Sequence, residues 1–217
     1  MKEGHNLIKA VLFDLDGTLL DTNELIYNSF CHAFKDVLNM ELSKAKITSL
    51  YGKPLNYSFT KYTDDEEIVQ KMIDVYRGYN AKHHDNMCKP FEGVVELLET
   101  LKNKGIRLGI VTSKRKVVAV RGMELADILK YMDVVISPES TKKHKPEGEP
   151  ALKACEILGV KPEETMMVGD ATYDLLCGKN AGCKTCGVEY TAIELEELIK
   201  VNPTYMVKKP LDILALV

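Results

Sequence analysis

The sequence has no excess of charge of either sign, because its 217 residues contain 29 Lys and Arg against 32 Asp and Glu, a net charge of −3. A chain so close to neutral has no basic field over its surface, which argues against nucleic acid as its main partner. It also lacks an apolar run of the ~20 residues that a membrane-spanning helix needs. Its first residues, MKEGHNLIKAVLFDLDG, contain no small-residue cleavage site and reach two aspartates early. We therefore predict a cytoplasmic protein without a membrane partner.

Repeats, low-complexity tracts and a disulfide framework are missing as well. The six cysteines are scattered through a chain that is too large to need disulfide bonds for its stability. Cys183 and Cys186 have the spacing of a zinc or redox pair, but no second pair accompanies them and they lie in an expected buried strand. We predict that they are structural thiols.

The composition is that of a folded protein, with 45% apolar and 28% charged residues. At about 150 residues per domain, the length indicates one large domain, or a core domain with a substantial insertion. Apolar runs that suit buried strands alternate with segments of helical spacing. The expected strands are 8–13, 107–112, 134–137, 165–169, 184–188 and 205–207, and the expected helices are 92–102, 116–129, 149–158, 172–181 and 193–199. This alternation predicts an α/β fold, a doubly wound, Rossmann-like parallel sheet with ligands beyond the carboxyl ends of its strands.

Residues 19–88 interrupt the alternation with helical segments and no strand between them. The first follows Asp21, where Asp21 to Glu24 fit a capping box. The others cover about 43–51 and 56–62 and a long stretch that opens at Asp64 with acidic residues, as the helix dipole favours. These segments predict a small α-helical bundle inserted after the first strand.

Two pairs of aspartates follow expected strands. Asp14 and Asp16 end the first strand, and residues two apart in an extended chain point to the same side. Holding two carboxylates together is costly without a cation, and Mg²⁺ prefers such oxygen ligands. Asp170 and Asp174 follow the strand at 165–169, where they fit either a helix N-terminus or the second half of a metal site.

Three further residues could hold an anion at the same edge of the sheet. Thr112 and Ser113 end the strand at 107–112, and hydroxyl residues are also common at strand ends for other reasons. Lys145 precedes an expected helix, where a lysine is often a solvated charge but can also reach a phosphate.

The four segments Asp14-Leu-Asp-Gly-Thr18, Thr112, Lys145-Pro146 and Gly169-Asp170-x-x-x-Asp174 occur in this order over nearly the whole chain. With these segments the sequence resembles the haloacid dehalogenase-like hydrolase superfamily. The resemblance implies a catalytic core of residues 1–18 and 89–217 and a helical cap of residues 19–88.

The resemblance also implies roles for the individual residues. Asp14 would be the nucleophile that forms an aspartyl-phosphate, and Asp16 the general acid and base. Thr112, Ser113 and Lys145 would bind the phosphate, with Lys145 also orienting Asp14. The predicted metal set, for Mg²⁺ as cofactor, is Asp14, Asp16 through its backbone carbonyl, Asp170 and Asp174.

Two other functions remain open beside a phosphohydrolase. Phosphomutases with this kind of cap carry a histidine early in the first cap helix, where this sequence has Ile26. A catalytically idle binding protein would not need Asp14 and Asp16. True dehalogenases of the superfamily lack the second aspartate, so Asp16 points to phosphoryl transfer.

The cap determines the substrate, and its stretches most resemble the phosphoglycolate phosphatase-like group and the bacterial pyrophosphatases within it. These stretches are Thr22–Ile26, Gly52–Leu55, Tyr76–Asn80 and His84-Asp85. A small phosphorylated metabolite and pyrophosphate both remain possible substrates, for a monomer or a homodimer. Lys53 lies in a Gly/Pro loop that could close over the site, and Arg77 and His84 are weaker cap candidates.

Overall fold

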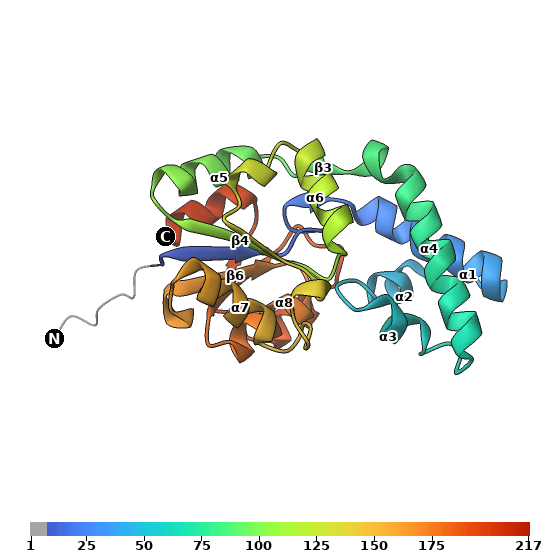
Figure 1. Cartoon of the computed structure of the whole chain (residues 1–217). Coiled ribbons are helices and arrows are strands. Elements are labelled where there is room, and N and C mark those ends of the chain that lie inside the picture. Colours follow the sequence, from blue (N-terminus) through green and yellow to red (C-terminus); the bar gives the residue numbers. More distant parts are fainter. Residues whose placement is uncertain (1–7) are drawn as a thin grey trace.

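The computed structural model describes residues 8–217, and its centre is a six-stranded, fully parallel sheet (Figure 1). The strand order is β5-β4-β1-β6-β7-β8. The strands are β1 (Ala10–Phe13), β4 (Arg107–Val111), β5 (Val134–Ile136), β6 (Thr165–Gly169), β7 (Lys184–Val188) and β8 (Tyr205–Val207). The predicted fold class, a doubly wound α/β sheet, is confirmed.

Strand β1 lies in the middle of the sheet because it is apolar on both faces. All of its four residues are buried, and it pairs with β4 on one side and β6 on the other. Phe13 is aligned with Ile110 of β4 and Val168 of β6. The three strands therefore end at one edge, where the residues that follow them meet.

Helices cover both faces of the sheet, as the parallel arrangement requires. One face packs against α5 (Val94–Asn103), α6 (Lys116–Leu125) and the short C-terminal helix Pro210–Ala215. The other packs against α7 (Glu149–Leu158) and α8 (Thr172–Asn180). Figure 1 shows α5 on one side of the sheet and α7 and α8 on the other. The last α-helix, α9 (Leu195–Lys200), lies between β7 and β8 in the chain.

The inserted segment forms a hydrophobic cluster separate from those on the two faces of the sheet. Its helices are α1 (Asn23–Leu38), α2 (Lys44–Thr48), α3 (Leu55–Phe59) and α4 (Glu66–Met87). The rings of Phe30, Phe34, Phe59 and Tyr76 pack edge to face in this cluster, with centroid separations of 4.9 Å for Phe30–Tyr76 and 5.6 Å for Phe30–Phe59. The chain enters and leaves through two short antiparallel strands, β2 (Leu20–Asp21) and β3 (Lys89–Pro90).

The predicted capping box at the start of α1 is wrong. The helix begins at Asn23, and Thr22 at its N-cap position makes no side-chain cap. Asp21 is instead part of β2, where it pairs with Lys89. The Thr22 hydroxyl donates a 2.7 Å hydrogen bond to Asp16 Oδ1. The hydroxyl that would cap the helix therefore belongs to the polar edge of the sheet.

Several helix ends also differ from the sequence pattern. The helix expected at 116–129 ends at Leu125, and a separate 3₁₀ turn follows at Leu129–Tyr131. The helix expected at 43–51 stops at Thr48.

Cys183 and Cys186 are buried free thiols on either side of Lys184, the first residue of β7. Within residues 8–217, none of the helices combines the length and the apolar character needed to cross a bilayer.

Candidate active site at the carboxyl edge of the sheet

The carboxyl edge of the sheet gathers the polar residues that the sequence singled out. Asp14 follows β1, Thr112 follows β4 and Asp170 follows β6, while Lys145 reaches the same edge from the loop before α7. These four residues and Asp174 are each at most 6% exposed. A buried group of this charge needs partners, since desolvating unpaired ions is costly.

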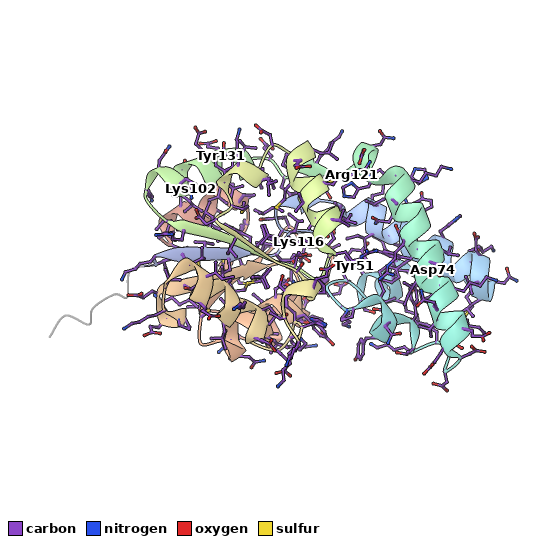
Figure 2. All side chains as sticks on the ribbon, in the orientation of Figure 1. Tyr51, Asp74, Lys102, Lys116, Arg121 and Tyr131 are labelled. Atoms are coloured by element: carbon purple, nitrogen blue, oxygen red, sulfur yellow. The ribbon has the colours of Figure 1, made fainter. Side chains whose placement is uncertain are left out.

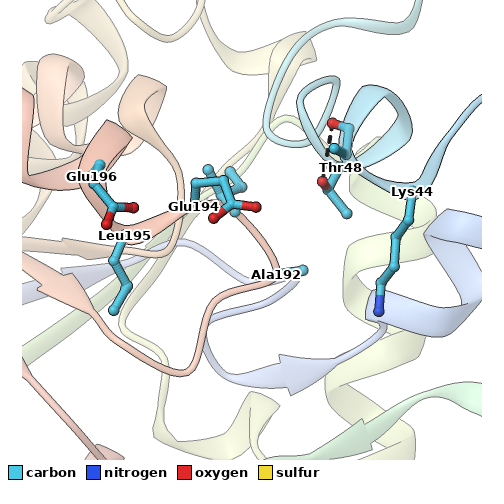
Figure 3. Close-up of a pocket in the computed structure, with 8 residues that line it drawn as sticks. Lys44, Thr48, Ala192, Glu194, Leu195 and Glu196 are labelled. Carbon is cyan, nitrogen blue, oxygen red and sulfur yellow. Dashed lines mark hydrogen bonds between the residues drawn. The ribbon is translucent and has the colours of Figure 1, made fainter.

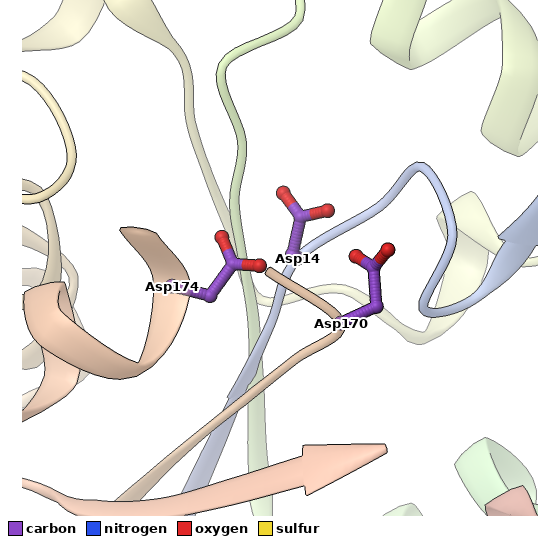
Figure 4. Close-up of side chains that lie close together, drawn as sticks. All are labelled: Asp14, Asp170 and Asp174. Carbon is purple, nitrogen blue, oxygen red and sulfur yellow. The ribbon is translucent and has the colours of Figure 1, made fainter. Parts of the chain in front are cut away.

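Three carboxylates converge at this edge (Figure 4). One oxygen from each of Asp14, Asp170 and Asp174 lies within 4.8 Å of the others. Lys145 Nζ donates to Asp14 Oδ1 at 2.6 Å, to Asp174 Oδ1 at 2.5 Å and to the Val111 carbonyl at 3.1 Å. One ammonium group thus bonds two of the three carboxylates, and the cluster keeps a surplus of acidic groups.

Burial and the neighbouring charges shift the pKa values of the cluster. Burial raises the pKa of Asp14 to about 7, although Lys145 acts in the opposite direction. Burial, together with the charges of Asp174 and Asp14, raises the pKa of Asp170 well above its usual value. Burial disfavours the charge of Lys145, yet its ion pairs with Asp14 and Asp174 raise its pKa. A divalent cation among these oxygens would remove the repulsion, and an all-oxygen donor set suits Mg²⁺.

Two threonines that the sequence analysis missed fix Asp170. Thr18 donates to Asp170 Oδ1 at 3.2 Å, and Thr191 donates to the Asp170 carbonyl at 2.8 Å. Asp174 is fixed by the backbone N–H of Ala171, which donates to its Oδ2 at 3.0 Å. Both carboxylates are therefore held in place before any ligand binds.

Asp16 stands apart from the three carboxylates. Its Oδ1 accepts hydrogen bonds from Thr22 Oγ1 and Lys114 Nζ, both at 2.7 Å. Lys114 is a third residue that the sequence analysis missed, and its only signal was its place directly after Thr112-Ser113. The Lys114 side chain is only 11% exposed. Its ammonium group adds a positive charge at this edge of the sheet.

Gly17 permits the tight turn that follows Asp16, and this turn lies directly against the Asp170 side chain. Its φ is +83°, and a Cβ at this position would lie 2.3 Å from Asp170 Oδ2. We expect Gly17→Ala to displace Asp170 and to lower the free energy of unfolding by about 1–3 kcal/mol, measured by urea unfolding. Gly78→Ala in α4 is the matched control, since nothing lies within 4 Å of its Cβ position. It should leave stability unchanged or raise it.

The remaining predicted binding residues contact other parts of the protein. Ser113 Oγ donates to the Gly52 carbonyl at 3.4 Å, which joins the loop after β4 to the inserted helices. Lys53 Nζ donates to the Ser49 carbonyl at 2.6 Å and lies 6.0 Å from the ring centroid of Tyr173. Lys53 therefore sits at the boundary with α8, next to the Asp170–Asp174 segment. Arg77 makes no ion pair within residues 8–217.

A cleft of about 640 Å³ opens between α2 and the chain before α9 (Figure 3). Lys44 and Thr48 line one side, and residues 192–196, including Glu194 and Glu196, line the other. None of the three clustered aspartates, Lys145 or Thr112 borders this cleft. It is therefore separate from the carboxylate cluster.

Comparisons with known proteins agree with this geometry. The model of the haloacid dehalogenase-like hydrolase family matches residues 11–188. A Clostridium perfringens protein named putative pyrophosphatase PpaX is 56% identical over 211 residues, 97% of this chain and 98% of that protein. Pyrophosphatase PpaX of Halalkalibacterium halodurans is 41% identical over 97% of each chain. The solved structure of a predicted phosphatase from Clostridium acetobutylicum has a TM-score of 0.85 at 29% identity, covering 95% of this chain and 96% of that one.

Fold and site together define a doubly wound α/β protein with an acidic site beyond its central strands. The chain belongs to the haloacid dehalogenase-like hydrolase family. The predictions of this family and of a hydrolase are confirmed.

Proposed function

We propose that this protein is a Mg²⁺-dependent phosphohydrolase that cleaves inorganic pyrophosphate through an aspartyl-phosphate on Asp14. The buried cluster of Asp14, Asp170 and Asp174 around Lys145 carries the proposal, because it combines a nucleophile with a place for a cation. The names of relatives at 56% and 41% identity support pyrophosphate as the substrate. The proposed division is a catalytic core of residues 1–18 and 89–217 and a cap of residues 19–88.

Asp14 attacks one phosphorus atom of the substrate. A bond forms between a carboxylate oxygen and phosphorus, and the bond to the bridging oxygen breaks, so that one phosphate leaves. Lys145 orients the carboxylate through its 2.6 Å hydrogen bond and supplies positive charge beside the phosphoryl group. Thr112 and Ser113, at the end of β4, contribute hydroxyl and amide groups that hold the phosphoryl oxygens.

Asp16 moves the protons. In the first step it gives a proton to the leaving phosphate, and in the second it takes one from the water that hydrolyses the aspartyl-phosphate. To do so its carboxylate must leave Thr22 and Lys114, the two groups that bind it in this structure.

Asp14, Asp170 and Asp174, with the backbone carbonyl of Asp16, would hold the metal. Mg²⁺ supplies positive charge that offsets the repulsion between the attacking carboxylate and the phosphate. Thr18 and Thr191 keep Asp170 in position for this role. Addition of a chelator is expected to abolish phosphate release.

Lys53 is the cap residue placed best to meet the second phosphate. It lies over Tyr173 at the boundary between cap and core, and closure of the cap would carry it toward the site. We expect Lys53→Ala to raise KM for pyrophosphate about tenfold, the cost of one charge-assisted hydrogen bond. Lys71→Ala is the control, because Lys71 is an exposed lysine on α4 of the same cap. An unchanged KM in Lys53→Ala would remove Lys53 from the site.

A phosphate-release screen with Mg²⁺ tests the proposed function. The panel contains pyrophosphate, phosphoglycolate, sugar phosphates and nucleotides, with a metal-free reaction for each. We expect the highest kcat/KM for pyrophosphate. A higher value for phosphoglycolate or a sugar phosphate would contradict pyrophosphate as the substrate and leave a phosphatase of small metabolites.

A further inference from the structure

His84 is a buried histidine with an unused ring nitrogen. It lies near the C-terminal end of α4, and it is 1% exposed. Its Nδ1 is 3.2 Å from Asp85 Oδ1. Its Nε2 is also buried and has no hydrogen-bond partner within residues 8–217. Leaving such a group unpaired costs about 1–3 kcal/mol, so it calls for an explanation.

The surroundings of the ring determine which nitrogen carries the proton. Asp85 Oδ2 accepts from Arg121 of α6 at 2.5 Å, and Arg121 holds the pKa of Asp85 below its usual value. Figure 2 shows Arg121 where α6 faces α4. The ionised carboxylate only accepts hydrogen bonds, so Nδ1 must carry the N–H. Burial lowers the pKa of His84, which keeps the ring neutral and makes Nε2 an acceptor.

The ring lies within electrostatic range of the acid–base residue of the site. The positive charge of Lys114 lowers the pKa of His84, and the negative charge of Asp16 raises it. Lys114 donates here to Asp16 Oδ1 at 2.7 Å, and an ammonium group has two further protons to donate. The ring lies against Gly122 of α6, where a Cβ would lie 3.4 Å from His84 Cε1 and 3.2 Å from Cδ1 of Leu20, the residue bridged to Asp16. The ring thus lies at the root of the cap, on the side of Leu20 and α6.

We propose that His84 is a positioning residue whose Nε2 accepts a hydrogen bond from Lys114 and holds that ammonium while Asp16 turns to the leaving group. The proposal rests on the proposed function, in which Asp16 transfers the protons. The observed hydrogen bonds join Arg121, Asp85 and His84 on one side and Lys114 and Asp16 on the other, and the proposed bond would connect the two groups. Without the Nε2 acceptor, Lys114 stays on Asp16 and keeps its carboxylate away from the substrate.

Two substitutions separate the acceptor from the rest of the ring. Asparagine at position 84 reaches only as far as Nδ1 and keeps the contact with Asp85, whereas glutamine places a carbonyl oxygen near the position of Nε2. We expect His84→Asn to lower kcat for Mg²⁺-pyrophosphate about tenfold to a hundredfold with KM within about twofold of wild type. His84→Gln should retain most of the activity. His83→Gln is the matched control, because His83 lies on the ring of Tyr79, with centroids 4.4 Å apart.

A double-mutant cycle tests whether His84 acts through Lys114. In a Lys114→Met background, His84→Asn should cause no further loss of kcat. An equal fractional loss in both backgrounds, or equal kcat values for His84→Asn and His84→Gln, would overturn the proposal and leave a packing role.

A spectroscopic readout tests the contact without turnover. In Asp14→Asn saturated with Mg²⁺-pyrophosphate, the ¹⁵N spectrum of His84 should show a protonated Nδ1 and an Nε2 signal that moves in Lys114→Met but not in Lys61→Met. An Nε2 signal that does not respond to Lys114→Met would overturn the proposal. Failure of the wild-type protein to cleave pyrophosphate would count against the proposed function alone.

Discussion

Replacing Asp14 with asparagine is expected to reduce Mg²⁺-dependent phosphate release by at least about 10⁴-fold, because the amide cannot form the phosphoryl bond. The substitution preserves shape, and Lys145 keeps its hydrogen bond to Asp174 at 2.5 Å. The fold should therefore survive, which thermal unfolding and near-ultraviolet circular dichroism can check. Phosphate release is measured with excess pyrophosphate and Mg²⁺.

The matched control for this experiment is Asp36→Asn on α1. Asp36 is an exposed aspartate that faces His32 at 3.3 Å, far from any role in the site. Its turnover should equal that of the wild-type protein. Wild-type-like turnover in Asp14→Asn itself would rule out Asp14 as the nucleophile.

Replacing Lys145 with methionine is expected to affect stability as well as activity. Lys145 is the ammonium group that bonds Asp14 and Asp174, and it is 4% exposed. Its loss leaves buried carboxylates without that cation, which should lower the free energy of unfolding by about 3–5 kcal/mol in metal-free buffer. Mg²⁺ should restore part of this loss, since it binds only the folded cluster. Urea unfolding with and without Mg²⁺ measures both effects.

Lys143→Met provides the comparison, because its side chain is exposed in the same loop and only its backbone N–H bonds Glu149, at 2.9 Å. Its stability should be within about 0.5 kcal/mol of wild type, as for most surface substitutions. If Lys145→Met were as stable as Lys143→Met without metal, the electrostatic account of the cluster would be wrong.

The sequence was most informative where local pattern and position in the sheet coincide. The apolar run before Asp14 predicted a central buried strand, and the alternation from residue 90 predicted the parallel sheet. Because parallel strands end at one edge, these two features were enough to predict that Asp14, Thr112 and Asp170 would meet.

The local sequence pattern could not predict contacts between segments that lie far apart in the chain. Asp14 and Asp16 were expected to face the same way, yet the Asp16 carboxylate bonds Thr22 and Lys114 and lies apart from the cluster. Lys114 and Asp16 are 98 positions apart in the sequence, and no local periodicity predicts a contact over that separation. Thr191 likewise reaches Asp170 from a loop beyond β7.

The capping box failed for a related reason. Its residues matched the local pattern, but the pairing of Asp21 with Lys89 and the hydrogen bond from Thr22 to Asp16 use those groups in other ways. The conformation of Asp21 and Thr22 is therefore determined by these tertiary contacts and not by a helix cap. Tertiary context of this kind routinely overrides local preference.

The most direct test of the central claim is to trap the phosphorylated enzyme. Asp16→Asn removes the acid of the first step and the base of the second. Because phosphate is a good leaving group that needs little help from an acid, the second step should slow more than the first. After mixing with Mg²⁺-pyrophosphate and quenching with acid, mass spectrometry should find one phosphoryl group on the peptide that carries Asp14, together with a burst of one phosphate per enzyme. A burst without modification of Asp14, or phosphorylation of a different residue, would contradict the account.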